Sequence, residues 1–172
     1  MYKESRLENG LRLMSQYNSG SESVSILCLV GAGSRYEVEE NRGISHFLEH
    51  MFFKGGEKFN NAREVSSAID AIGGDFNAFT GKEYAGYYVK CAREHIDTAC
   101  AVLSDMLIKA TFKQEEIEKE RGVILEELNM YIDTPMYQVS WNFEYFLFGD
   151  QPLGWDTIGT KKLINNVSQK DF

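Results

Sequence analysis

Hydrophobic and polar residues alternate over the first thirty positions, a pattern typical of β-strands. Tyr2–Leu7 and Leu11–Tyr17 flank an Asn-Gly dipeptide at positions 9 and 10, which is a strong hairpin signal. A polar loop leads to a third predicted strand, Val24–Val30. Its apolar run, Ile26–Val30, is short enough to be one buried strand. The N-terminal region is therefore predicted to consist of β-structure.

Helical spacing of apolar residues begins near residue 43. Residues 43–54 predict a first helix, and Ala62–Ile72 predicts a second one that two glycines stop. Two strands, Asp75–Thr80 and Tyr84–Ala92, then flank a three-residue turn and predict an aromatic-rich hairpin. The remaining periodic segments predict three more helices: Glu94–Ala110, Gln114–Ile132, and a segment from Thr134 to about Phe148.

This order of elements predicts an α+β fold, in which helices cover a mixed or antiparallel sheet, rather than a doubly wound sheet. The 172 residues show no internal repeat and no dividing linker, so we expect a single domain, 1–172. Hydrophobic residues make up 43% and charged residues 26% of the chain, which is ordinary globular usage.

Charge and cysteine content exclude several classes of function. Eighteen basic and 26 acidic residues give a formal net charge of −8, which argues against nucleic-acid binding and against an anionic membrane surface. No apolar run approaches the roughly 18 residues of a membrane span. Three cysteines without a C-x-x-C pair argue against a disulfide scaffold or a cysteine zinc site. Without a signal-peptide pattern, we expect a cytoplasmic protein.

Two of the three histidines lie in one short motif, His46-Phe47-Leu48-Glu49-His50. On a helix, residues four positions apart share a face, so both imidazoles can meet one zinc ion at about 2.0–2.1 Å. Glu49 lies at the edge of that face, close enough to act on water at the metal. Paired histidines on a helix can also be ordinary surface or core residues, but the inverted H-x-x-E-H order is typical of zinc peptidases.

A catalytic zinc site needs a third protein ligand. In the predicted helix Gln114–Ile132, apolar positions 117, 124, 128 and 131 recur at helical spacing and define the buried side. Glu120 and Glu127 share one face at the margin of this side, so either could be the ligand while the other supports it. Glu126 lies roughly opposite and is expected to be solvated. His95, at a predicted helix start, is a weaker candidate.

Several stretches resemble one protein family. Gly43–Met51 is similar to the zinc-binding helix of the pitrilysin/insulinase family, which includes mitochondrial processing peptidase and many bacterial processing proteases. The similarity continues, in order and over nearly the whole chain, through Gly73–Thr80, Glu120–Glu127, Met130–Pro135 and Pro152–Gly154.

The resemblance implies a processing-peptidase-like metallohydrolase fold and a zinc-dependent endopeptidase that cleaves extended peptides with zinc-activated water. It implies that His46, His50 and Glu127 bind one zinc ion per chain. It also implies that Glu49 is the catalytic base and that Glu120 is a supporting carboxylate of the catalytic site.

The same resemblance places the strand Asp75–Thr80 beside the zinc, where it pairs with the substrate. Asn77 and Ala78 are therefore expected substrate contacts, because an extended peptide can add to a sheet edge. The alternative is that side chains of this strand only pack on one sheet face. Phe52 and Phe53 are open to two interpretations, a side-chain pocket or core packing.

Members of this family are longer than this chain. A second, similarly folded half supplies an Arg/Tyr pair near the substrate carbonyl and closes a chamber. We therefore expect an N-terminal zinc-binding domain that is incomplete at its C-terminus and can bind zinc yet be inactive alone. The expected partner is the missing half or a second subunit, with a dimer as the full-length form.

Two other functions remain open at the level of sequence. One is a noncatalytic partner or scaffold subunit of a processing-peptidase-like complex, although such members usually lose part of the zinc motif, which is complete here. The other is a zinc lyase of the sulfur-ribose type, which also uses an H-x-x-E-H helix in a chain of similar length. That second alternative does not explain the hairpin at Asn77–Thr80 or the carboxylates Glu120 and Glu127.

Overall fold

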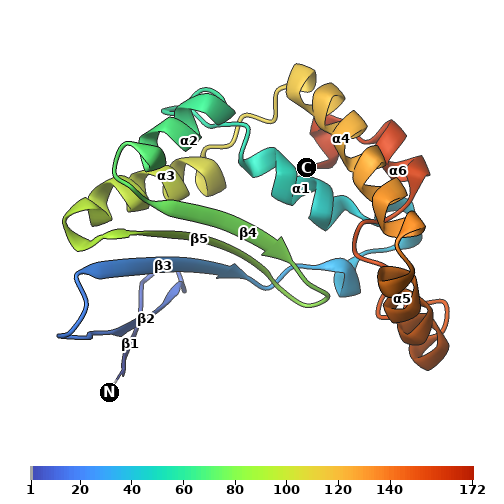
Figure 1. Cartoon of the computed structure of the whole chain (residues 1–172), viewed down its shortest axis with the longest axis horizontal. Helices are drawn as coiled ribbons and strands as arrows, with labels where there is room; N and C mark the ends of the chain where they lie inside the picture. The colour runs from blue at the N-terminus through green and yellow to red at the C-terminus, as the bar shows by residue number, and fades with distance from the viewer. Residues whose placement is uncertain (1) are drawn as a thin grey trace.

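The N-terminal hairpin forms a small sheet of its own in the computed structural model, which describes residues 2–172 (Figure 1). Strand β1 (Tyr2–Arg6) pairs antiparallel with β2 (Arg12–Gln16). Gly10 adopts a φ of 89° in the turn, a left-handed conformation that glycine tolerates at low cost. The hairpin predicted from the Asn-Gly dipeptide is confirmed.

The main sheet has three strands in the order β3-β5-β4, and all pairs are antiparallel. Strand β3 spans Ser23–Val30, β4 spans Asp75–Thr80 and β5 spans Ala85–Ala92. Helices cover one face of this sheet (Figure 1), which confirms the α+β class. Among the described residues, β4 is an edge strand, so one side of its backbone is not paired by another strand.

The five predicted helices are present, with ends that differ by a few residues. The segment expected to start at Glu94 begins as a 3₁₀ turn, Arg93–His95, before the α-helix. A sixth helix was not predicted because it is too short to show a period. None of these helices is long and apolar enough to cross a membrane. The helices are α1 (Ile44–Phe52), α2 (Ala62–Asp70), α3 (Ile96–Ile108), α4 (Gln114–Asp133), α5 (Pro135–Phe148) and α6 (Lys161–Asn166).

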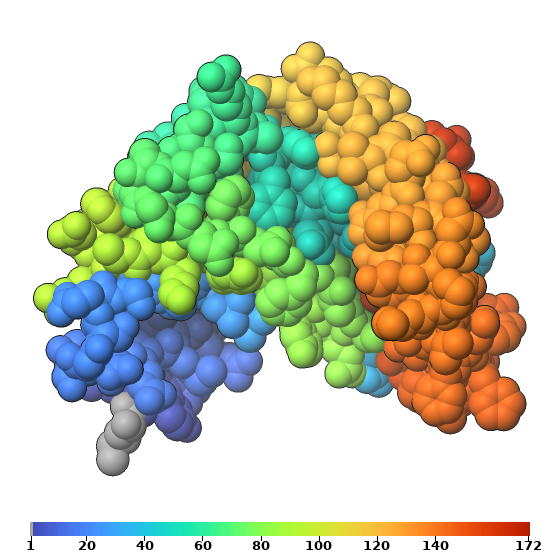
Figure 2. Space-filling view, in the orientation of Figure 1, coloured from blue at the N-terminus to red at the C-terminus, as the bar shows by residue number. Residues whose placement is uncertain are grey.

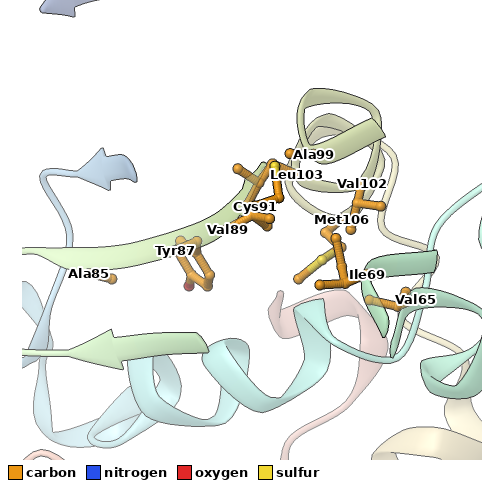
Figure 3. Close-up of a cluster of buried hydrophobic side chains, with 10 residues drawn as sticks. All are labelled: Val65, Ile69, Ala85, Tyr87, Val89, Cys91, Ala99, Val102, Leu103 and Met106. Carbon is orange, nitrogen blue, oxygen red and sulfur yellow. The ribbon is translucent and has the colours of Figure 1, made fainter. Parts of the chain in front are cut away.

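A first core lies between the sheet and helices α2 and α3. Ten buried side chains meet there (Figure 3): Val65, Ile69, Ala85, Tyr87, Val89, Cys91, Ala99, Val102, Leu103 and Met106. The prediction that the run Ile26–Val30 is buried is wrong for three of its five side chains, Leu27, Leu29 and Val30, which are exposed. Strand residues alternate between faces, so Leu27 and Leu29 lie on the uncovered face and are 50% and 58% exposed.

A second core joins α1 to α4 and α6. Phe47 and Met51 of α1 are fully buried against Ile117 and Ile124 of α4 and Ile164 of α6. Helix α1 also contacts β4, so it lies between the sheet and the long helix α4. This position brings the H-x-x-E-H motif, the edge strand and the carboxylates of α4 to the same place.

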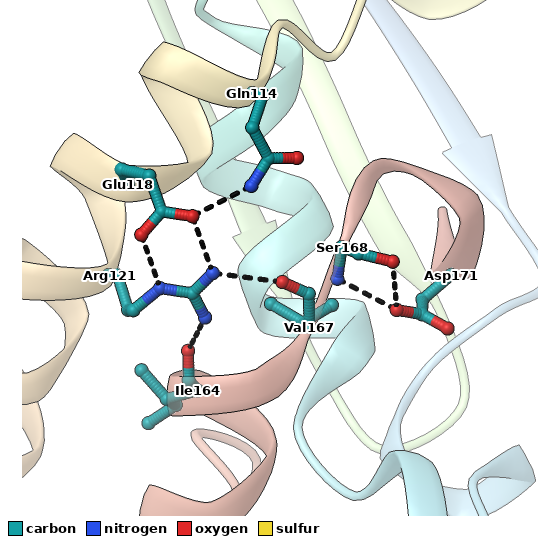
Figure 4. Close-up of polar contacts among 7 residues, drawn as sticks. All are labelled: Gln114, Glu118, Arg121, Ile164, Val167, Ser168 and Asp171. Carbon is teal, nitrogen blue, oxygen red and sulfur yellow. Dashed lines mark hydrogen bonds and ion pairs between the residues drawn. The ribbon is translucent and has the colours of Figure 1, made fainter.

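Arg121 fastens the end of the chain to α4 (Figure 4). Its guanidinium donates to the carbonyl oxygen of Val167 at 2.9 Å and to that of Ile164, and it pairs with Glu118 of the same helix at 3.0 Å. Charge-assisted bonds to two carbonyl oxygens fix α6 against α4. They thereby hold the helix that carries Glu120 and Glu127.

Candidate metal centre

The start of α1 is fixed by a buried carboxylate. Glu37 is 4% exposed and accepts hydrogen bonds from the backbone N–H groups of Gly43, at 2.7 Å, and Ser45, at 2.9 Å. These N–H groups have no partner within the helix, so the carboxylate both satisfies them and complements the helix dipole. Gly43 has a φ of 102°, and a side chain there would collide with Gly159. The helix therefore begins in one defined position.

His46, His50 and Glu127 converge between α1 and α4. Each offers one ligand atom, and the three atoms lie within 4.8 Å of one another. The Nε2 atom of His46 is 3.7 Å from Glu127 Oε1, and the Nε2 atom of His50 is 3.3 Å from Glu127 Oε2. Ligands bound 2.0–2.2 Å from one zinc at tetrahedral angles lie about 3.3–3.6 Å apart. The spacing and the donor set of two imidazoles and one carboxylate therefore fit a catalytic zinc site.

Glu120 supports His50 from the opposite side of the ring. Its Oε2 atom is 3.1 Å from His50 Nδ1, and its Oε1 atom is 2.5 Å from the Lys54 ammonium. When Nδ1 carries the proton and donates to Glu120, the lone pair of His50 Nε2 faces Glu127 and is free for a metal. Of these two carboxylates, only Glu127 faces both histidines, so the geometry favours Glu127 over Glu120 as the third ligand.

The two histidines differ in their electrostatic surroundings. Burial lowers the pKa of His46 to about 4, so this ring is neutral and can bind a metal without first losing a proton. Burial also disfavours the charged form of His50, but its contacts with Glu120 and Glu127 outweigh burial and raise its pKa to about 9. The contact with His50 in turn lowers the pKa of Glu127. The side chains of His46, His50 and Glu127 therefore form a compact, charge-coupled group.

Glu49 projects from the same helix toward the edge strand. Its Oε2 atom accepts a hydrogen bond from the Thr80 hydroxyl at 2.5 Å. Burial raises the pKa of Glu49, which makes this carboxylate a better proton acceptor than an exposed one. The nearby charge of Glu127 also raises the pKa of Glu49, and both side chains line one cavity, so Glu49 lies within reach of a water beside the three candidate ligands.

These groups line a cavity of about 410 Å³ that opens to solvent. Figure 2 shows the recess in which α1 lies, between the strand β4 and the helices α4 and α5. Its volume falls in the range typical of ligand pockets. A second cavity of about 470 Å³, lined in part by Phe53 and Phe76, lies beside the other end of β4. Phe53 therefore lines a pocket, whereas Phe52 packs against Tyr87 and Phe112.

The backbone of β4 has a free hydrogen-bonding edge at Ala78. Gly81 donates to the Tyr84 carbonyl oxygen at 2.9 Å, so the hydrogen-bonded pairs with β5 fall on odd-numbered β4 residues. The N–H and C=O of Ala78 consequently point away from β5. The Ala78 N–H donates to the Asn77 side-chain oxygen at 2.9 Å, and the Asn77 side chain is exposed. The role of these two residues in substrate binding stays a prediction.

Other candidates lie elsewhere. His95 sits at the start of α3, beside Glu94, and does not join the centre. Glu126 is exposed, as its helical position predicts. Sequence reasoning missed Lys54 as a partner of Glu120; Lys54 lies in the turn that follows α1, four residues after His50. It also missed Glu37, which lies in irregular structure and shows no periodic signal.

Comparisons with known proteins agree with this geometry. Residues 12–161 match the family described as insulinase (peptidase family M16). The chain is 43% identical over 164 residues to the "uncharacterized zinc protease YmxG" of Bacillus subtilis, covering 95% of this chain and 40% of that protein. It is 37% identical over 167 residues to the mitochondrial-processing peptidase subunit beta of Rattus norvegicus, covering 96% and 34%.

A solved structure has the same fold. The crystal structure of a protease from Helicobacter pylori superposes with a TM-score of 0.92 and 27% identity, covering 99% of this chain and 41% of that one. The chain thus spans about 40% of the length of the Bacillus relative and of the Helicobacter protease.

Proposed function

We propose that this chain, which belongs to the insulinase family of peptidases (peptidase family M16), holds the catalytic metal centre of a zinc metalloendopeptidase. The observation that carries the proposal is the convergence of His46, His50 and Glu127 within 4.8 Å, with Glu49 beside them. The names of the Bacillus and rat relatives as a zinc protease and a processing peptidase support the same chemistry.

The roles of the residues follow from their contacts. His46, His50 and Glu127 would hold one zinc ion per chain, and Glu120 would orient His50 through Nδ1. When bound, zinc supplies Lewis-acid chemistry that polarises a peptide carbonyl and makes water more acidic. Glu49 accepts a proton from the attacking water and returns it to the leaving nitrogen. Thr80 holds the Glu49 carboxylate toward the cavity through its hydroxyl.

We place the substrate along the free edge of β4. An extended peptide can pair with the outward N–H and C=O of Ala78. The Asn77 side-chain amide, which now accepts from the Ala78 N–H, can turn to the peptide instead. This position carries the peptide past the cavity that contains Glu49. The binding energy comes from main-chain bonds, so it favours unfolded or extended substrates over a particular sequence.

Replacement of Ala78 by proline tests this edge. Ala78→Pro removes the outward N–H without taking a donor from the β4–β5 ladder. We expect kcat/KM to fall about 10-fold, as one hydrogen bond of about 1–1.5 kcal/mol is lost, with zinc content unchanged. Ala78→Ser keeps the N–H and serves as the matched control. Equal kcat/KM in both variants, measured with a fluorogenic peptide, would place the substrate elsewhere.

We also propose that the chain works within a larger enzyme. It spans about 40% of the Bacillus relative, and α5 has no buried residue. Several large apolar side chains of this helix are more than half exposed: Met136, Val139, Phe143, Phe146 and Leu147. Apolar surface of this kind on one element is typical of an interface. A further half of the polypeptide or a second subunit would cover α5 and close the cavity.

The proposal is tested by zinc-dependent cleavage. The complete enzyme should cleave an unfolded polypeptide, lose this activity when a chelator removes the metal, and regain it when about one equivalent of zinc per chain is returned. Cleavage products identified by mass spectrometry distinguish peptidase activity from the alternatives. Zinc binding without cleavage would indicate a noncatalytic subunit, and turnover of a ribosyl thioether alone would indicate a lyase.

A further inference from the structure

A lysine lies behind the candidate metal centre, on the side of His50 that faces away from Glu127. Glu120 joins the two, because its Oε2 atom is 3.1 Å from His50 Nδ1 and its Oε1 atom is 2.5 Å from the Lys54 ammonium. The side chain of Glu120 is only 9% exposed, and that of Lys54 is 20% exposed. Both oxygens of a nearly buried carboxylate are therefore occupied, one by the histidine and one by the lysine.

The loop after α1 fixes the direction from which Lys54 approaches Glu120. Gly55 follows with a φ of 105°, and a side chain there would collide with the carbonyl oxygen of Phe59, so this turn requires glycine. Asp105 of α3 is 6% exposed and accepts hydrogen bonds from the backbone N–H groups of Lys58, at 3.0 Å, and Phe59, at 2.9 Å. A buried carboxylate thus holds the loop, and the backbone at Lys54 has a defined position.

Glu120 depends on the lysine because it is a carboxylate with little access to water. Burial alone would raise the pKa of Glu120, but the hydrogen bonds from His50 and Lys54 outweigh burial and lower this pKa. Without the ammonium group, Oε1 would lose a charge-assisted bond inside a nearly closed site, which is costly for a buried acceptor. The carboxylate would then rotate to recover a partner, and its bond to His50 Nδ1 would lose its geometry.

Two effects of Lys54 on a zinc ion act in opposite directions. Its positive charge repels the cation, whereas its contact with Glu120 keeps His50 Nε2 directed toward Glu127, 3.3 Å away. The repulsion is small, because the negative charge of Glu120 lies 2.5 Å from the ammonium and nearer to the histidine, so most of the lysine's field is cancelled. The positioning effect has no such compensation, and it should therefore be the larger of the two.

We propose that Lys54 is a positioning residue of the metal centre. It anchors Glu120 so that Glu120 holds the His50 ring with Nε2 toward Glu127, and it thereby increases the affinity of the site for zinc. This inference rests on the metal centre of the proposed function. It extends the support of His50 by one residue, from Glu120 to the turn at the end of α1.

Lys54→Met in the complete enzyme tests this role, because methionine keeps an unbranched stem and removes the ammonium group. Competition with a chelator measures the zinc affinity. We expect it to fall about 3–10-fold, less than the 10–100-fold that follows loss of a direct partner of a metal-binding histidine, since Lys54 acts one contact further away. Lys54→Gln is a second neutral variant that should lower the affinity in the same direction, and it replaces the methionine variant if that protein does not fold.

Two comparisons separate positioning from a general effect of charge or folding. Lys119→Met removes the same charge next to Glu120, but Lys119 is 66% exposed and pairs with Glu116, so the zinc affinity should stay within about twofold of the wild type. In the Glu120→Gln background, Lys54→Met should change the affinity by less than about twofold, because the lysine acts through Glu120. The visible absorption bands of the cobalt-loaded enzyme should shift in Lys54→Met and stay unchanged in Lys119→Met.

The outcomes separate this inference from the function on which it rests. A wild-type enzyme that binds no zinc would overturn both proposals. Zinc binding without peptide cleavage would overturn the peptidase function, while the comparison of affinities still decides the role of Lys54. The positioning role alone would be overturned by an unchanged or increased affinity in Lys54→Met, by an equal loss in Lys119→Met, or by a loss that persists undiminished in the Glu120→Gln background.

Discussion

Glu49→Gln is expected to leave zinc bound and to lower kcat for peptide cleavage by about 10²–10⁴-fold, the usual contribution of general acid–base catalysis. The amide keeps the size of the side chain and can still contact Thr80, which now bonds the carboxylate at 2.5 Å. It cannot accept a proton from water. Because burial raises the pKa of Glu49, the native carboxylate is a stronger base than its ordinary value indicates, and the substitution removes that advantage.

Glu126→Gln is the matched control for this variant. It makes the same chemical change on an exposed position of α4, so activity and zinc content should stay within about twofold of the wild type. Steady-state kinetics of the complete enzyme and metal analysis of the same samples provide the two readouts. Retention of full activity by Glu49→Gln would remove Glu49 from the mechanism, whereas loss of zinc would show that its role is in binding the metal.

The sequence predicted the part of the site that local geometry controls. Residues four apart share a helix face, so the joint position of His46 and His50 follows from helix formation alone. Glu120 and Glu127, seven apart, were likewise predicted to share a face, but helical spacing could not separate their roles. That distinction arises from the way α1 packs on α4, which places His50 Nε2 toward Glu127 and Nδ1 toward Glu120.

The pattern of hydrophobic and polar residues did not predict the contacts between segments that are distant in the sequence. The bond from Thr80 to Glu49 joins positions 31 apart and depends on β4 packing against α1. Glu37 supports the start of α1 from an irregular segment, where periodicity carries no information. The run Ile26–Val30 shows the opposite error. Its continuous hydrophobicity favoured a buried strand, yet the uncovered sheet face leaves alternate side chains exposed.

Replacements of Glu120 and Glu127 on α4 should differ in their effect on zinc affinity, and this difference is the strongest test of the metal centre. Glu120→Gln is expected to weaken zinc binding by about 10–100-fold, the usual effect of losing a residue that orients a ligand. In the Glu120→Gln variant, excess zinc would still saturate the site. Glu127→Gln is expected to weaken binding by more than this, because only Glu127 faces both His46 and His50, at 3.7 and 3.3 Å.

Competition with a chelator of known zinc affinity, followed by native mass spectrometry, measures both effects on the complete enzyme. Glu126→Gln again provides the control with unchanged affinity. Equal effects of the two variants would mean that α4 supplies one shared electrostatic field and no distinct ligand. A larger loss of zinc affinity in Glu120→Gln would make Glu120 the metal ligand and Glu127 the supporting carboxylate. Lys54, 2.5 Å from Glu120, would then face a metal ligand, an arrangement in which its positive charge opposes the metal. Lys54 pairs with Glu120 and not with Glu127. For this reason we expect Glu127→Gln to lower the zinc affinity more than Glu120→Gln does.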